Sequence, residues 1–275
     1  MLSPNNYSIT FACYNAVEYT KKCIASFAAT GTPLDRVVIV DNCSTDGTRD
    51  YLQTLNLGGR IFNSANMGCG VAWNQGALAL QSEWTIVMNN DVVVCGNWIE
   101  NLIGTAKRLD LKVISPAMIE GDLDYDFKKF STDACTRLST VERRGDRNPV
   151  CLAIHRSVFM EAGYFRAETK LMGYEDILFF NALRLNKIQT SITGASWLHH
   201  FGSITQTLLK QERGMKQSDS LAARANSRLL NQSYFTRKLN KVRRNKQQKM
   251  WRDAEVAAHE MSLRGERVNG QFNWH

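Results

Sequence analysis

Residues 36–48 read RVVIVDNCSTDGT, and this stretch decides the fold class. It begins with a nearly continuous β-branched run, as expected of a central parallel strand that is buried on both faces. The run ends in a polar loop that contains an Asp-Gly pair, and a helical pattern follows it. A buried strand that leads through a polar loop into a helix is the repeating part of an α/β protein.

The same succession recurs on both sides of this stretch. We expect strands at residues 8–13, 60–62 and 84–88, and helices at 16–28 and 70–80. Strands that alternate with helices of about a dozen residues indicate βαβ units and a parallel sheet. Ligands of such sheets bind at the carboxyl ends of the strands, so the residues directly after each strand are the candidates for a site.

Those residues are strongly polar. Tyr14-Asn15 follows the first strand, Asp41 begins the loop of the second, and Asn89-Asn90-Asp91 follows the strand at 84–88. Helix capping alone would account for Asn15 and for the residues from Ser44 onward. It accounts less well for Asp41 and Asp91, because neither precedes an obvious helix start.

The second half of the chain is less regular. Residues 112–150 contain an acidic and a basic stretch, and we predict a mobile surface excursion that builds part of the binding pocket. A helix is expected from 173 to about 185, with Glu175 and Asp176 in its first turn, and a short strand at 188–193. Residues 205–263 have a mostly helical pattern. We therefore expect a main domain over residues 1–204 and a basic, mainly helical extension over 205–275.

The positive charge of the chain lies in this extension. The sequence holds 34 Lys and Arg against 26 Asp and Glu, a net charge of +8. Residues 1–206 hold 19 against 20, or −1, so residues 207–275 hold 15 against 6, or +9. A dense basic stripe has Tyr234, Phe235 and Trp251 interleaved, and its members are Arg237, Lys238, Lys241, Arg243, Arg244, Lys246 and Lys249. Anionic lipid headgroups, nucleic acid phosphates and plain solvation of a helical face are the three interpretations.

Several classes of protein are disfavoured by composition. The sequence has no apolar run of 18 residues, and residues 1–6 do not resemble a secretory signal. The 7 cysteines are scattered without zinc-site spacing, which is typical of reduced thiols. We expect a cytoplasmic protein, and peripheral attachment at the inner membrane surface stays open.

Six segments, in order, resemble the family 2 glycosyltransferases of the GT-A fold, between about residue 8 and residue 203. The first is the strand that ends at Asn15, the second is VIVDNCSTDGT at 38–48, and the third is NMGCGVAWNQG at 66–76. NNDV at 89–92 stands where the family has its DXD motif. MGYED at 172–176 resembles the acceptor-side motif, and HFGS at 200–203 resembles the late histidine motif.

The resemblance implies a GT-A, Rossmann-like fold with a mixed, mostly parallel sheet flanked by helices and a C-terminal helical extension. It also implies a UDP- or dTDP-sugar as donor and a divalent metal, Mn²⁺ or Mg²⁺. By motif position it places these residues in the donor pocket: Asn15, Asp41, Ser44, Asn66, Gly68, Asn74, Asn89 and Asn90. Two of these assignments have alternatives, because Asp41 could cap a turn instead of binding the base, and the glycines of 66–76 could serve helix packing.

Asp91 and His200 are the implied metal ligands. A divalent ion would stabilise the charge that develops on a departing diphosphate, and a carboxylate suits such an ion. The sequence NND in place of DXD removes one carboxylate, and the imidazole of His200 favours Mn²⁺ over Mg²⁺. His199 and His200 are adjacent and are expected to point apart. One of them is then a packed or hydrogen-bonded histidine, and motif position favours His200 as the ligand.

Glu175 and Asp176 are the expected catalytic pair. Inverting displacement of a nucleoside diphosphate requires a base for the proton of the acceptor hydroxyl. Acids in a first helical turn also stabilise the helix without any catalytic role. The resemblance assigns the base to Asp176 and orientation of the acceptor to Glu175.

These features favour an inverting glycosyltransferase that acts on a glycan or a lipid-linked glycan. The basic extension motivates a second hypothesis, a glycosyltransferase that modifies hydroxymethylated bases in nucleic acid. A nucleotide-sugar-binding module without catalysis is the third. The retained Asp91, Glu175 and Asp176 argue against the third.

Overall fold

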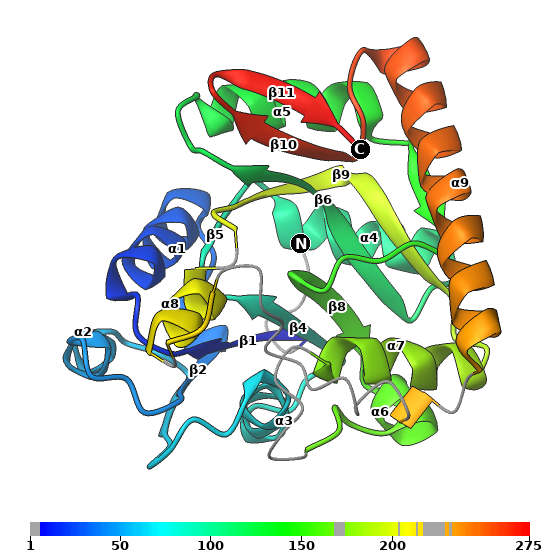
Figure 1. Cartoon of the computed structure of the whole chain (residues 1–275). Helices are drawn as coiled ribbons and strands as arrows, with labels where there is room; N and C mark the ends of the chain where they lie inside the picture. Colours follow the sequence, from blue (N-terminus) through cyan, green and yellow to red (C-terminus); the bar gives the residue numbers. More distant parts are fainter. Residues whose placement is uncertain (1–5, 168–173, 203, 213, 217–228, 231–232) are drawn as a thin grey trace.

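The computed structural model describes residues 6–167, 174–202, 204–212, 214–216, 229–230 and 233–275. A mixed sheet lies at its centre, and helices flank both faces (Figure 1). The strands are β1 (Tyr7–Cys13), β2 (Val37–Asp41), β3 (Gly59–Phe62), β4 (Trp84–Asn89), β5 (Val92–Val94), β6 (Val113–Gly121), β7 (Glu142–Arg144), β8 (Cys151–His155), β9 (Thr190–His200), β10 (Arg264–Val268) and β11 (Gln271–Trp274). The helices are α1 (Val17–Thr30), η1 (Leu34–Arg36), α2 (Thr48–Thr54), α3 (Cys69–Ala79), α4 (Trp98–Arg108), α5 (Phe127–Leu138), α6 (Ser157–Ala162), α7 (Glu175–Leu185), α8 (Ile204–Glu212) and α9 (Tyr234–His259).

Hydrogen bonding arranges the strands in the order β11-β10-β6-β8-β4-β1-β2-β3, and β9 pairs with β5, β6 and β7. β1 runs parallel to β2 and to β4, and β2 runs parallel to β3. β8 is antiparallel to β4 and β6. The predicted α/β fold with a mixed, mostly parallel sheet is therefore confirmed, and the carboxyl ends of β1, β2 and β4 meet at one edge.

The alternation of β1 shows how one strand serves two helical layers. Ile9 and Phe11 are fully buried in the core that α1 and α4 cover. Thr10 points to the opposite face, where α3 crosses it. A β-carbon on Gly76 of α3 would lie 1.7 Å from the hydroxyl oxygen of Thr10, so only glycine lets the helix approach this closely. The packing interpretation of the glycines thus holds for Gly76.

The prediction of a mobile excursion over residues 112–150 is wrong. Most of β6 is buried, and it pairs with β8, β9 and β10. The acidic residues that follow have structural partners. The side chain of Asp126 caps α5 by accepting a hydrogen bond from the Lys129 backbone N–H at 3.0 Å. Asp124 accepts one from Arg267 at 2.7 Å. The sequence pattern missed the partner of Asp124 because Arg267 lies 143 residues further along the chain.

The C-terminal extension is helical only in part. α9 is a long helix, as predicted, but β10 and β11 form an antiparallel hairpin, and β10 adds to the main sheet beside β6. The sheet therefore crosses the predicted boundary at residue 204. Arg143 of β7 holds α9 in place, because its fully buried guanidinium donates to both carboxylate oxygens of Glu255 at 2.8 Å. It also donates to Gln248 and Ser262, at 2.9 and 2.7 Å.

β9 is longer than the strand predicted at 188–193, and it carries His199 and His200 at its end. In the part of the chain that the structure describes, no helix combines the length and the apolar character needed to cross a bilayer.

Candidate active site

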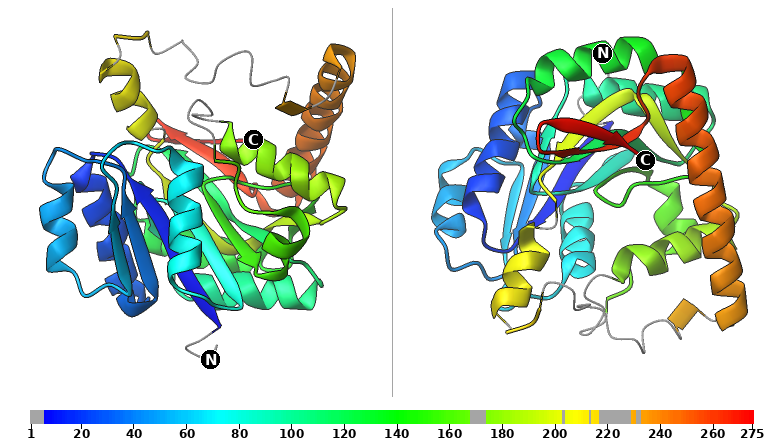
Figure 2. Two further views of the ribbon diagram at one scale, coloured as in Figure 1. Left: turned by 90° about the horizontal axis from the view of Figure 1, so that it is seen from below. Right: turned by 45° about the horizontal axis from the view of Figure 1, so that its top comes forward.

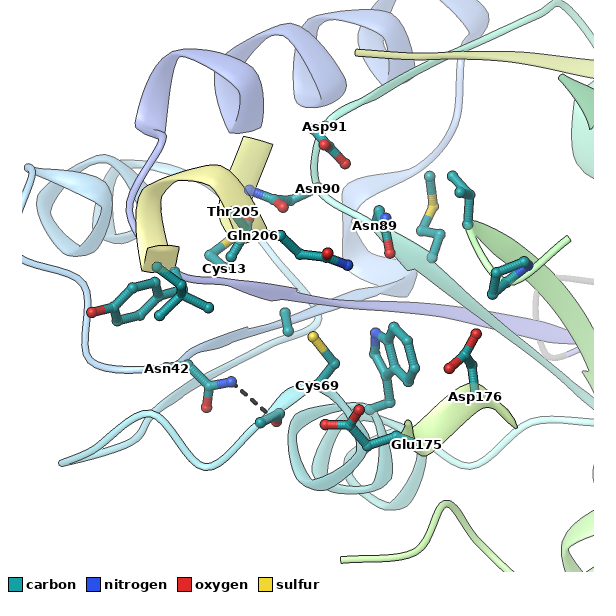
Figure 3. A pocket seen from close by; sticks show the side chains of 18 of the residues that line it. Cys13, Asn42, Cys69, Asn89, Asn90, Asp91, Glu175, Asp176, Thr205 and Gln206 are labelled. Atoms are coloured by element: carbon teal, nitrogen blue, oxygen red, sulfur yellow. Dashed lines mark hydrogen bonds between the residues drawn. The ribbon is translucent and has the colours of Figure 1, made fainter. Parts of the chain in front are cut away.

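A cavity of about 320 Å³ opens at the carboxyl ends of β1 and β4. It collects most of the residues predicted for the site: Asn66, Gly68, Asn89, Asn90, Asp91, Glu175, Asp176 and His200. Figure 3 shows Asp91 on one side of the cavity and Glu175 with Asp176 on the other, with Asn89 and Gln206 between them. We refer to the two sides as the β5 end and the α7 end.

Strand pairing assembles the β5 end. Asp91 lies between β4 and β5, and the antiparallel register of β5 with β9 places Val92 opposite His200. The backbone N–H of Phe201 donates to the carbonyl of Asp91 at 3.0 Å, which fixes the two segments side by side. As a result, His200 Nε2 lies 3.3 Å from Asp91 Oδ1 and 3.4 Å from Asn89 Nδ2.

Glu120, at the end of β6, completes the charge arrangement. Its Oε2 lies 3.5 Å from His200 Nδ1, so the imidazole lies between two carboxylates. Burial alone would lower the pKa of His200, but Asp91 and Glu120 outweigh it and raise that pKa to about 9. The same contact with His200 lowers the pKa of Glu120. Without a metal, the imidazolium is therefore a cation between the two acids. A metal that binds Nε2 would have to displace its proton.

His199 has a different environment, as expected of adjacent residues in a strand. It is fully buried, and its Nδ1 lies 3.0 Å from the hydroxyl of Tyr125. The rings of Tyr125, Phe127 and Phe201 contact it edge-on. Burial lowers the pKa of His199 to about 4, so this histidine is neutral. The prediction that the two histidines point apart, one of them packed, is confirmed.

The α7 end carries the predicted catalytic acids. Both residues lie in the first turn of α7, as the sequence indicated. Glu175 is buried, and a β-carbon on Gly70 would lie 3.0 Å from its Cγ, so the glycines of 68–70 make room for it. Burial raises the pKa of Asp176, and the charge of Glu175 adds to the rise. A carboxylate with raised proton affinity is suited to accept a proton.

The loop before α3 lines the cavity beside Glu175 of the α7 end. The side chain of Asn66 accepts from the Gly68 backbone N–H at 3.0 Å, and Asn42 Nδ2 donates to the Gly68 carbonyl at 3.1 Å. Asn63 connects Asn42 to Gln75 through side-chain hydrogen bonds of 2.8 to 3.0 Å. This network holds Gly68 at φ 86°, a left-handed conformation that favours glycine.

The structure places Asn15, Ser44 and Asp41 outside the residues that line the cavity. The Asn15 backbone N–H donates to Ser44 Oγ at 2.8 Å, so these residues tie the end of β1 to the loop after β2. The carboxylate of Asp41 is fully buried; it accepts from the Ser44 backbone N–H at 3.2 Å and from Arg49 at 2.6 Å. Recognition of the base by Asp41 stays a prediction, and its observed contacts order the loop.

Asn74, also predicted for the donor pocket, lies outside the cavity lining as well. Its amide donates to the Phe165 carbonyl at 2.7 Å and accepts from the Phe165 backbone N–H at 3.0 Å. Phe165 stacks on Phe179 of α7, with ring centroids 4.2 Å apart. Asn74 therefore acts on the site indirectly, by holding the segment that packs against α7.

Several lining residues were not among those predicted for the site. Trp73 is 6% exposed, and its indole N–H has no hydrogen-bond partner among the described residues. Thr205 and Gln206 come from α8, whose end is fixed where Tyr14 and Asn15 donate to Glu212 at 2.6 and 3.1 Å. The one sequence feature that could have indicated Trp73 is its position directly before Asn74.

The residues of the β5 end fit a divalent cation in part. Asp91 and His200 offer an oxygen and a nitrogen ligand at 3.3 Å from each other, close enough to share one ion. Within the described ranges no group of three or more His, Cys, Asp or Glu side chains could hold a metal by itself. A metal here would need further ligands from a bound phosphate and water, as Mg²⁺ and Mn²⁺ sites in phosphate-binding enzymes commonly have.

Solved structures with the same architecture include TarS from S. aureus, 19% identical, with a TM-score of 0.52 over 72% of this chain and 61% of that one. Another is GalNAc-T7, 16% identical, with a TM-score of 0.55 over 71% of this chain and 43% of that one. These likenesses confirm the predicted GT-A fold. The profile described as glycosyl transferase family 2 matches residues 8–169, more than half of the chain. The chain therefore belongs to the family 2 glycosyltransferases, a family of sugar-transferring enzymes.

Curated relatives match over shorter stretches. An uncharacterized glycosyltransferase of Rickettsia conorii is 30% identical over 107 residues, which is 38% of this chain and 18% of that protein. TuaG of Bacillus subtilis, named for teichuronic acid biosynthesis, is 33% identical over 88 residues, 30% of this chain and 35% of that protein. The matched region is thus a minor part of each relative's length.

Proposed function

We propose that this protein is an inverting glycosyltransferase that uses a UDP- or dTDP-sugar and a divalent metal, and glycosylates a hydroxyl of a glycan or a lipid-linked glycan. The observation that carries the proposal is the single cavity that joins the Asp91–His200 pair to Asp176. A cavity of about 320 Å³ lies within the range of small-ligand sites.

A nucleoside diphosphate would occupy the side of the cavity formed by β1, β4 and the 66–68 loop. Asn66, Asn89 and Asn90 line it with amide groups that can donate to phosphate or ribose oxygens. Two structures of the same fold support this choice of donor, because TarS was solved with UDP-GlcNAc and GalNAc-T7 with UDP, GalNAc and Mn²⁺.

The metal would be held by Asp91 and His200, with the remaining ligands from the diphosphate and water. A bound divalent ion supplies electrostatic stabilisation to the diphosphate leaving group. The contribution of the protein is to hold the two ligands in place through the β5–β9 pairing.

Asp176 would accept the proton of the acceptor hydroxyl. The acceptor oxygen forms a bond to the anomeric carbon while the bond from that carbon to the diphosphate oxygen breaks. The electron pair of the broken bond leaves with the nucleoside diphosphate, and the proton moves to the Asp176 carboxylate. One displacement of this kind inverts the anomeric configuration. The buried Glu175 beside it would orient the acceptor.

The test is calorimetry with UDP, dTDP and a panel of their sugars, with and without Mn²⁺, followed by a transfer assay with NMR of the anomeric proton. The proposal expects metal-dependent donor binding and an inverted product. A retained configuration would exclude the single displacement. Donor binding with neither hydrolysis nor transfer would favour the non-catalytic binding module.

A nucleic-acid acceptor is the second candidate, and the charge of α9 motivates it. Eight Lys and Arg against two Asp and Glu lie on this helix. However, the ring of Trp251 packs against the body, with the Arg143 guanidinium carbon 5.7 Å from its centroid. That ring is therefore engaged and is a poor stacking platform for bases, which leaves glycan acceptors favoured.

A further inference from the structure

α9 has two faces of different chemistry, and one of them points away from the protein. Gln248 and Glu255 face the body, where both bind Arg143. On the outer side, apolar side chains are exposed to solvent: Leu239 is 50% exposed, Val242 is 59% exposed and Met250 is 56% exposed. Large apolar side chains are not usually left exposed in a row, so this face calls for an explanation.

Helical geometry joins these side chains into one stripe. With about 100° of rotation per residue, Leu239, Val242 and Met250 fall within an arc of about 80°. Gln248 and Glu255 lie about 180° from the centre of that arc. Phe235, which is 80% exposed, falls on the same line at the start of the helix. We call these four residues the outer stripe.

Cationic side chains border the outer stripe. Lys238 and Lys249 lie along one edge of it, and Arg243 lies along the other. Lys246 lies at its centre, and all four cationic side chains are exposed. An apolar stripe with Lys and Arg along its edges is typical of helices that lie in the plane of an anionic membrane. Pairing with α9 of a second copy is disfavoured, since two strongly cationic helices repel and Lys246 interrupts the apolar line.

We propose that α9 binds the surface of an anionic lipid bilayer, with the outer stripe at the boundary of the acyl chains and the flanking cations among the headgroups. α8, which lines the cavity, and α9 lie on the same side of the molecule, toward which the carboxyl end of β1 points (Figure 2, left). Attachment through α9 therefore brings the cavity close to the lipid surface. The corollary that the acceptor is carried by lipid rests on the proposed function, whereas the attachment itself does not.

Vesicle co-sedimentation of the full chain tests the surface. Phosphatidylcholine vesicles are compared with vesicles in which about a third of the lipid is phosphatidylglycerol. Wild type is expected to bind the anionic vesicles at least tenfold more tightly. A stripe variant carries Leu239→Gln, Val242→Gln and Met250→Gln. It is expected to lose on the order of 10²-fold in binding, since burial of one apolar side chain is worth about tenfold or less at an interface.

Matched control variants test whether vesicle binding depends on the position of these side chains on α9 or only on the number of apolar or cationic side chains removed. Leu78→Gln, Met160→Gln and Leu185→Gln remove three exposed apolar side chains elsewhere and should leave vesicle binding unchanged. Arg243→Gln, Lys246→Gln and Lys249→Gln should cost on the order of 10²-fold, at about fivefold for each cation. Lys128→Gln, Lys129→Gln and Lys187→Gln remove the same charge from other exposed positions and should have little effect.

Each other outcome overturns the proposal. Equal binding by wild type and the stripe variant would show that the stripe does not enter the bilayer. Loss of oligonucleotide binding rather than vesicle binding in the cation variant would assign the helix to nucleic acid. A wild-type dimer that the stripe variant converts to monomer would assign it to self-association. UDP binding by calorimetry reports on the proposed function separately and should be the same in all four variants.

Discussion

The two ends of the cavity differ in how many of their charged and hydrogen-bonding groups already have partners before a ligand binds. At the β5 end, His200 lies 3.3 Å from Asp91 and 3.5 Å from Glu120, so each of the two carboxylates already has a cationic neighbour. At the α7 end, Asp176 has a raised pKa, and the described residues offer the Trp73 N–H no partner. The difference indicates that the β5 end is a prearranged charge site. At the α7 end, a carboxylate of raised pKa and a buried donor have no comparable charged partner among the described residues.

The largest effect is expected at the α7 end. Asp176→Asn keeps shape and hydrogen bonding but cannot accept a proton, so transfer should fall by about 10²–10⁴-fold with donor affinity nearly unchanged. Glu175→Gln should be milder, because Glu175 orients the acceptor. Steady-state transfer rates and calorimetry on both variants provide the measurement. If Glu175→Gln proved the more damaging, the base would be Glu175.

The next largest effect is expected at the β5 end. Asp91→Ala should remove the metal-dependent part of donor affinity, because one of the two protein ligands is gone. The loss should be at least about 10–10²-fold, which is the usual cost of removing even an outer-shell partner of a metal ligand. The fold should persist, which circular dichroism can check. Calorimetry with UDP and Mn²⁺ measures the loss. Unchanged Mn²⁺-dependent affinity would show that Asp91 is not a metal ligand.

The pH dependence of transfer should identify the base at the α7 end. Burial raises the pKa of Asp176 above 3.8, and only its carboxylate form accepts a proton. Transfer should therefore decline as pH falls through that raised pKa, by about tenfold per unit below it. Asp176→Asn should abolish this acid limb. An acid limb that survives in the variant would belong to another group.

The smallest effect is expected for Trp73→Phe, which removes the indole N–H and keeps an aromatic ring. A buried donor that gains a partner only in the complex contributes about 1 kcal/mol, so affinity for donor or acceptor should fall about fivefold. Thermal unfolding without ligand should shift to lower temperature, because Trp73 packs in a buried cluster against Phe165 and the smaller ring leaves a cavity. The affinities are therefore measured well below the unfolding temperature of the variant. No change in either affinity would leave Trp73 as a packing residue of the wall.

Local patterns in the sequence determined the parallel half of the sheet and the polar residues at its edge. The β-branched run at 37–40 and the residues after β4 obey rules that act over a few positions, namely burial of a central strand and helix capping. The position of Glu175 and Asp176 in a first helical turn was also predicted from a local rule, because acidic residues are favoured at the start of a helix. Most residues that the family resemblance assigned to the site do line the cavity.

Only the tertiary structure decided what these residues contact. Glu120 reaches His200 because β6 and β9 are paired, and Asn74 is directed to Phe165, 91 positions away in the chain. Arg143 ties β7 to Glu255, 112 positions away, and so turns the outer stripe of α9 away from the body. The sequence alone carries no local signal for such contacts, because they depend on strand order and on which side chains are buried together. Periodicity identifies a helix and its faces, but the packing of the whole chain decides which face stays exposed.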